Sequence, residues 1–254
     1  MLLVLRLTLA PIFIAIVTLA GRRWGPRAAA LVTALPVVVG PTFYFYAVQQ
    51  GHAFAAHAAV GSLFGLVGVA AFCAAYGHGA TRFSWPACLV MGWAAFGVTT
   101  FALRRVDADA VVGLVSATAS LLVVRRVLPR PGPPQPTRTH PAWDLPVRMI
   151  AAGTLVFVLT SLAARLGPAL SGLLTPFPVA TAIIAGFTHA QQGAAAVARF
   201  LRGYMLGLCS FGVFCFVLAV TLPTKTLALA LLAALAAQLV AQTILLRIIS
   251  AVGD

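Results

Sequence analysis

Nine long apolar runs dominate this sequence and leave few folds open to it. They cover residues 2–20, 28–48, 54–76, 85–103, 109–127, 147–165, 169–190, 199–222 and 226–246. A helix needs about 20 apolar residues to cross a bilayer, and a chain in lipid must satisfy its own backbone hydrogen bonds. The runs therefore predict an all-α integral membrane protein with about nine transmembrane helices.

The composition argues for the same environment. The chain is 61% hydrophobic and 8% charged, with a mean hydropathy of +1.02, and four acidic residues cannot coat a soluble protein of this size. Continuous apolar runs also argue against a β-barrel, whose strands alternate apolar and polar residues. The net charge of +13 comes from basic residues that fall mostly between the runs. We therefore expect membrane lipids as partners, and no nucleic acid.

The first run could also be a signal peptide, ending at Thr18-Leu19-Ala20, but almost no basic residue precedes it. We interpret it as a helix because the repeat described below gives it a counterpart. A proline-rich segment over 129–146 interrupts the pattern after the fifth run, and proline disfavours both helix and strand there. It is interpreted as a linker between two halves.

An internal repeat relates the two halves by a shift of 142 positions. Over residues 23–73 the shift gives 18 identities in 51 positions, whereas chance would give roughly one in ten in a composition this rich in Ala, Leu and Val. Residues 1–106 and 147–254 are thus predicted to be two four-helix repeats, helices 1–4 and 6–9, with a linking helix over 107–128. Five spans separate equivalent points, so the second unit must enter the membrane from the opposite face.

The basic residues test this inverted topology. With the N-terminus outside and the C-terminus in the cytoplasm, 12 of the 17 Lys and Arg residues lie on the cytoplasmic side and five outside. The positive-inside rule favours that orientation. The chain is therefore predicted to be a multi-pass protein with a cytoplasmic linker.

Two predicted helices contain proline near mid-depth, which frees backbone carbonyl groups. Thr33 and Pro36 lie in the second helix, and Thr175 and Pro178 occupy the equivalent places in the seventh. Broken helices often line the binding sites of repeat transporters. The alternative is a simple packing kink.

Other polar side chains lie near these two helices. Gln49, Gln50, Gln191 and Gln192 end them, where the amides could contact a solute or cap carbonyls. His189 could relay protons or make an ordinary hydrogen bond. Arg199 is the candidate counter-charge at the inner mouth; the alternative is that Arg199 anchors its helix in headgroups.

Several kinds of chemistry find no support in the sequence. No Asp or Glu falls inside an apolar run, so the buried carboxylate typical of small cation exporters is missing. Gly61 and Gly65, with their counterparts Gly203 and Gly207, are interpreted as helix-packing positions. We find no catalytic constellation and no metal-ligand spacing, since the four cysteines lie within apolar runs. The sequence predicts neither an enzyme nor a cofactor.

The stretch from Ser171 to Pro178, with Gln192-Gly193 and the basic start of the next helix, resembles the small GlpM-type bacterial inner-membrane proteins. The likeness covers about forty residues of the second unit and, more faintly, Leu35-Pro36 and Gly51 of the first. It implies four-helix units in a bacterial inner membrane and names no substrate.

The leading hypothesis is a small transporter or facilitator with a solute path between the two units, at helices two and seven. Without a fixed negative charge there, the solute is expected to be neutral or anionic. The alternative is a non-transporting protein that binds lipid or serves as an accessory subunit. The sequence leaves a homo-oligomer open.

Overall fold

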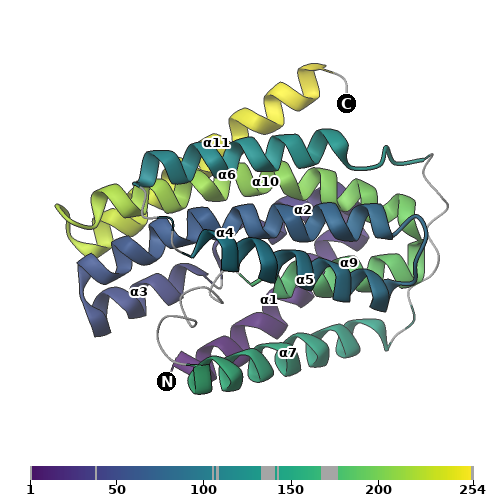
Figure 1. Ribbon diagram of the computed structural model, residues 1–254, viewed down its shortest axis with the longest axis horizontal. Helices are drawn as coiled ribbons and strands as arrows, with labels where there is room; N and C mark the ends of the chain where they lie inside the picture. The colour runs from purple at the N-terminus through teal and green to yellow at the C-terminus, as the bar shows by residue number, and fades with distance from the viewer. Residues whose placement is uncertain are drawn as a thin grey trace.

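The computed structural model describes residues 2–37, 39–104, 106, 109–132, 141, 143–166 and 177–252. Within these ranges all regular secondary structure is helical, in ten helices (Figure 1). In chain order they are α1 (Leu2–Trp24), α2 (Pro26–Thr33), α3 (Val39–Gln50), α4 (His52–Gly79), α5 (Trp85–Leu103), α6 (Ala110–Val127), α7 (Asp144–Leu166), α9 (Val179–Gln192), α10 (Ala194–Thr221) and α11 (Leu227–Val252). The prediction of an all-helical fold is confirmed for the described residues.

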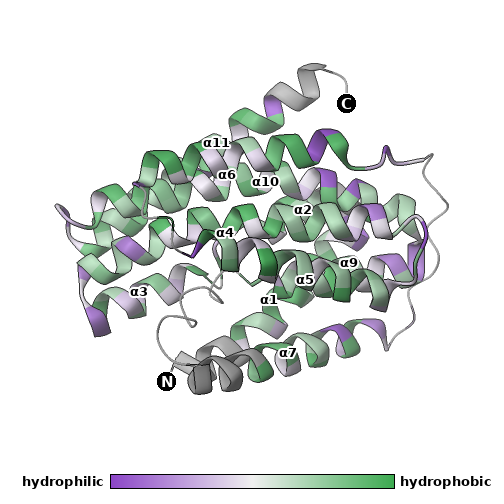
Figure 2. Cartoon of the chain, in the orientation of Figure 1, coloured by the Kyte–Doolittle hydropathy of each residue, from purple (hydrophilic) through white to green (hydrophobic). Residues whose placement is uncertain are grey.

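Five of these helices are long and apolar enough to cross a membrane, namely α4, α5, α6, α10 and α11. The fifth predicted run, 109–127, is among them as α6. Figure 2 shows hydrophobic residues along these helices and hydrophilic residues gathered at helix ends. The chain is thus a multi-pass membrane protein by the length and composition of its helices.

Two glycines set sharp junctions between neighbouring helices. Gly51 joins α3 to α4 with a φ of 91°, and Gly193 joins α9 to α10 with a φ of 78°. A side chain is rarely tolerated at such angles, so glycine is the residue that lets one helix end and the next begin without a loop. The carbonyls of both glycines accept the first hydrogen bond of the following helix.

The second predicted run folds as two helices and not as one. The sequence predicts a single span over 28–48, but α2 ends at Thr33 and α3 begins at Val39. Pro36 has no N–H to donate, and its ring disfavours a helical conformation at Leu35. Leu35 N instead closes a tight turn on the carbonyl of Val32, at 3.1 Å. The proline thus opens the helix instead of merely bending it.

Helices α4 and α10 form the centre of the molecule and run antiparallel (Figure 1). A Cβ built on Gly77, near the end of α4, would lie 3.4 Å from Leu201 Cδ1, near the start of α10, and one on Gly212 would lie 3.6 Å from Leu66 Cδ1. In the most apolar stretch of α10, 72% of the residues are buried, whereas in the corresponding stretch of α11 only 17% are buried. The core therefore follows α10, and α11 lies at the periphery.

Helices α1 and α7 form a second antiparallel pair. Arg22, at the end of α1, contacts Asp144, at the start of α7, and a Cβ on Gly153 would lie 3.6 Å from Pro11 Cγ. Helix α7 begins three residues before the predicted run 147–165. That extension brings Asp144 into the helix, where it becomes part of the site described next.

Candidate functional site

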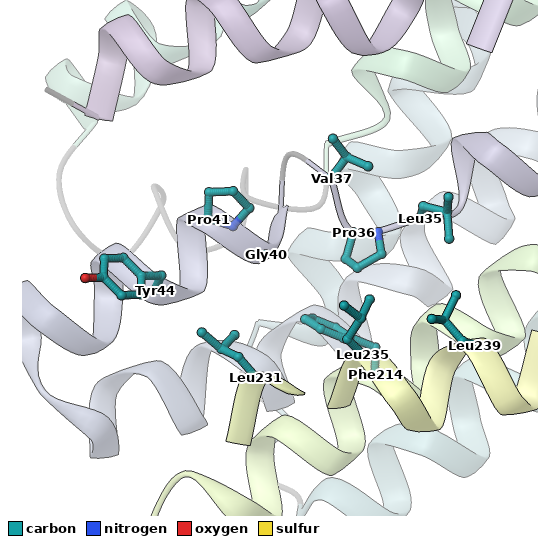
Figure 3. A pocket seen from close by; sticks show the side chains of 10 residues that line it. All are labelled: Leu35, Pro36, Val37, Gly40, Pro41, Tyr44, Phe214, Leu231, Leu235 and Leu239. Atoms are coloured by element: carbon teal, nitrogen blue, oxygen red, sulfur yellow. The ribbon is translucent and has the colours of Figure 1, made fainter. Parts of the chain in front are cut away.

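An apolar groove lies at the break between α2 and α3, beside α11 (Figure 3). Its volume is about 580 Å³, within the range of small-molecule pockets. It is lined by Leu35, Pro36, Val37, Gly40, Pro41, Tyr44, Phe214, Leu231, Leu235 and Leu239. Because the two helices separate at Pro36, the side chains of α11 face the break and not a continuous helix. This groove is called the α3–α11 groove below.

Two glutamines of α11 satisfy backbone carbonyls at the end of α2. Gln238 Nε2 donates to the carbonyl of Ala34 at 3.0 Å, and Gln242 Nε2 donates to that of Leu31 at 3.4 Å. Gln238 is fully buried. A helix that ends within apolar surroundings leaves carbonyl groups that need partners, so these amides stabilise the break.

A cluster of charged and amide side chains joins α1, α7 and α9 at the opposite end of the molecule from the start of α1 (Figure 1). Arg148 Nε donates to both carboxylate oxygens of Asp144, each at 2.9 Å, and Arg22 Nη2 donates to Oδ2 at 2.7 Å. Gln191 Nε2 donates to Asp144 Oδ1, and its Oε1 accepts from Arg148 Nη2 at 3.2 Å. These four residues are called the Asp144 cluster.

The Asp144 cluster carries one excess positive charge, because two guanidinium groups surround a single carboxylate. Arg148 and Asp144 are both buried, and the Arg148 guanidinium carbon lies 4.7 Å from the centre of the Phe187 ring. Arg22 is half-buried, and its Nε has no hydrogen-bond partner among the described residues. The cluster therefore contains one buried N–H donor that no described residue satisfies.

The pKa of Asp144 is set by opposing effects. Burial disfavours the carboxylate, but hydrogen bonds from Arg148, Gln191 and Arg22 outweigh it and hold the pKa of this carboxyl below its usual value. Asp144 precedes the predicted apolar run 147–165 and lies outside it. It is thus an ionised partner of the two arginines at neutral pH.

A polar pair connects α4 to α9, the helix that carries Gln191. Tyr76 Oη of α4 lies 3.4 Å from His189 Nδ1 of α9, and the two rings meet edge to face with centroids 6.0 Å apart. His189 is two residues before Gln191. The end of α9 thus contributes Gln191 to the Asp144 cluster and His189 to the pair with Tyr76. It therefore links α4 to the α1–α7 pair.

The residues predicted in the first unit do not gather at one place. Thr33 Oγ1 donates to the carbonyl of Ala29 at 2.6 Å, so its hydroxyl bonds within its own helix. Pro36 lines the α3–α11 groove. Gln49 and Gln50 are exposed at the end of α3.

The residues predicted in the second unit lie mostly at the other end. Thr175 falls outside the described residues, and Pro178 immediately precedes α9. Gln191 belongs to the Asp144 cluster, with His189 nearby and half-buried Gln192 at the end of α9. Arg199 Nη1 donates to the carbonyl of Gly132 at 2.8 Å, which ties the start of α10 to the linker.

The partnership of Asp144, Arg148 and Arg22 was not predicted from the sequence. Opposite charges four residues apart, as at Asp144 and Arg148, are a recognisable helix pattern and could have predicted half of it. Arg22 lies 122 positions from Asp144. No local sequence pattern predicts a contact between residues so far apart in the chain.

Comparison with protein-family models, curated proteins and solved structures finds no match to this chain. The resemblance to GlpM-type proteins stays a prediction. Function is therefore inferred from the geometry of the described residues.

Proposed function

We propose that this chain is a small inverted-repeat membrane transporter or facilitator, which passes a neutral or anionic small solute between its two four-helix units. The observation that carries the proposal is the antiparallel pairing of α1 with α7 and of α4 with α10. Each pair joins helices that hold the same place in the two halves. Inverted units packed about their shared interface are a common architecture of secondary transporters.

The helix boundaries support the repeat. The starts of three helix pairs each differ by 142 positions: Leu2 and Asp144, His52 and Ala194, Trp85 and Leu227. Helices α4 and α10 also end 142 positions apart, at Gly79 and Thr221. The same offset gives the sequence identities, so helix length and sequence agree on one alignment.

One contact has the form expected of an internal two-fold relation. Pro11 and Gly153 are equivalent under the 142-position shift, and they face each other across the α1–α7 pair. Where a two-fold axis crosses an interface, a residue meets its own equivalent. Units related in this way point in opposite directions along the membrane normal, as the odd number of predicted spans requires.

The Asp144 cluster supports the expected charge of the solute. It lies between α1 and α7, the helices that pair the two units, and it has one positive charge in excess. A cation would meet repulsion there, whereas an anion would be attracted, and the buried Nε of Arg22 is a donor without a partner among the described residues. We assign the counter-charge to Arg22 and Arg148 in preference to Arg199, whose guanidinium bonds the linker.

Transport can be tested with purified protein in liposomes, using labelled glycerol, acetate, inorganic phosphate and tetraethylammonium. We expect flux of a neutral or anionic probe and none of tetraethylammonium. Arg22→Gln should lower the anion flux about tenfold, the scale of one charge-assisted hydrogen bond. The neighbouring Arg23 is exposed and serves as the matched control, since Arg23→Gln should leave flux unchanged.

Two results of this flux experiment would contradict different parts of the proposal. Uptake of tetraethylammonium by the native protein would contradict the charge assignment. Equal loss of flux in the Arg22 and Arg23 variants would show that the membrane-surface charge, and not the Asp144 cluster, governs transport. Both variants should insert and purify as the native protein does.

The apolar α3–α11 groove favours a second candidate, a lipid-binding protein that does not transport. The described residues that line it are apolar except for the Tyr44 hydroxyl. Cysteine labelling along α2 and α9, in a background without the four native cysteines, separates the two. Water-soluble reagents should reach α9 near Gln191 if a solute path exists, and should reach neither helix if the chain only binds lipid.

A further inference from the structure

We infer that the α3–α11 groove binds one acyl chain of a membrane phospholipid, from the leaflet that meets the start of α11. The inference rests on membrane insertion and not on transport. It is carried by four features of the groove, which are its lining, its open side, its depth and the charge at its end.

The groove opens toward the surface that lipid covers. Leu235 and Leu239 of α11 are 40% and 48% exposed, and Tyr44 of α3 is 47% exposed. Helix α11 is one of the five candidate spans, so exposed leucines on it face hydrocarbon and not water. A lipid chain can therefore enter from the side. Figure 3 shows the Tyr44 hydroxyl directed away from the leucines.

The depth of the groove matches one leaflet. Leu231 lies four residues after the start of α11 and Leu239 lies twelve after it. At about 1.5 Å per residue the groove runs from about 6 Å to about 18 Å along the helix. Half of the bilayer core is about 15 Å thick. The groove thus extends from near one membrane surface to about mid-depth, as the acyl chain of a single leaflet does.

Among the described residues, no side chain fills the space next to Gly40. Gly40 lines the groove, and a Cβ built on it would meet nothing within 4 Å. The nearby carbonyls of Ala34 and Leu31 already accept from Gln238 and Gln242. An acyl chain in the groove would therefore meet mainly apolar side chains, and these two carbonyls already have hydrogen-bond donors.

A cation stands at the shallow end of the groove. Lys225 is exposed and lies two residues before α11 begins. Ammonium groups at the ends of spanning helices attract phosphate headgroups. This charge favours a phospholipid over a neutral apolar ligand, because one molecule then meets both the leucines and the lysine.

The inference can be tested by native mass spectrometry of the full chain released from nanodiscs of phosphatidylglycerol and phosphatidylcholine. We expect one phospholipid retained per native chain. Gly40→Leu fills the groove and should lower the retained phospholipid about tenfold, the scale of a leucine-sized apolar contact. Gly97→Leu is the matched control, because Gly97 is exposed on α5 with open space around it.

A second variant keeps the test decisive if Gly40→Leu fails to insert. Leu235→Trp blocks the groove from α11, with Leu232→Trp as its control, since Leu232 is 65% exposed and does not line the groove. Lys225→Gln should reduce the preference for phosphatidylglycerol while the acyl chain stays bound.

Three results would overturn the inference. The first is equal phospholipid retention in the groove variants and their controls. The second is retention of added oleic acid or of detergent without any phospholipid. The third is a native dimer that Gly40→Leu converts to a monomer, which would make a second copy of this chain the occupant of the groove.

Discussion

At the scale of single residues, Asp144 is the side chain that holds the Asp144 cluster together. It accepts hydrogen bonds from Arg148, Arg22 and Gln191, which come from three helices. Without its carboxylate, two guanidinium groups would remain together with no counter-charge. Removing one partner of a buried ion pair costs more stability than replacing both partners with apolar residues, because the remaining charge stays desolvated.

We therefore expect Asp144→Asn to lower the free energy of unfolding in detergent by about 3–5 kcal/mol. Thermal unfolding followed by circular dichroism would measure the loss. Asp109→Asn is the control, because Asp109 caps α6 through the N–H of Val112 and asparagine caps a helix equally well. Equal stability of the two variants would mean that the Asp144 cluster contributes no net stability.

The same carboxylate predicts a pH dependence. The pKa of Asp144 is lower in the folded chain than in the unfolded one, so the unfolded state binds its proton more readily. Its contribution is complete above the unfolded value of about 3.9 and is lost as the pH falls through the lower folded value. The midpoint temperature of thermal unfolding should therefore decrease when the pH is lowered below about 4. In Asp144→Asn this part of the decline should disappear.

At the scale of helices, close packing depends on a few small residues. A Cβ on Gly207 of α10 would lie 2.6 Å from Ala34 Cβ and 3.4 Å from the carbonyl oxygen of Ala30. Neither neighbour is the end of a flexible side chain, so neither can move aside easily. Gly207 thus allows α10 to approach α2, whereas Gly61 of α4 has open space around it.

Gly207→Ala should consequently destabilise the protein by about 1–3 kcal/mol through overpacking. The matched change Gly61→Ala should be neutral or stabilising by up to about 1 kcal/mol, because alanine is the better helix former. Unfolding in detergent compares the two. A stabilising Gly207→Ala would mean that α2 and α10 separate without cost.

At the scale of the whole molecule, the proposed inversion fixes where the ends of the chain lie. Under this proposal five passes separate the N-terminus from the linker, and four more lead to the C-terminus. Reporter fusions at residues 1 and 138 should therefore report opposite sides of the membrane, and fusions at 138 and 254 the same side, the cytoplasmic one. Fusions at 1 and 138 on the same side would exclude the inverted arrangement.

Features local in sequence could be predicted, and features that join distant segments could not. Gly51 and Gly193 end helices through their own conformational freedom, and Pro36 opens a helix through its missing N–H. By contrast, Gln238 and Ala34 are 204 positions apart. The α3–α11 groove depends on how two distant helices pack, so no run of residues could reveal it.

Joining the two proposed units in one chain would also let each unit change independently in evolution. Under the proposed repeat, Gln238 and Gln242 of α11 are equivalent to Phe96 and Thr100 of α5. The glutamines bond the end of α2, whereas Phe96 packs against Phe177, with ring centroids 5.4 Å apart. In a pair of identical subunits one codon change would alter both faces at once. In this chain each mutation is inherited by one unit alone, so selection can change the two units separately.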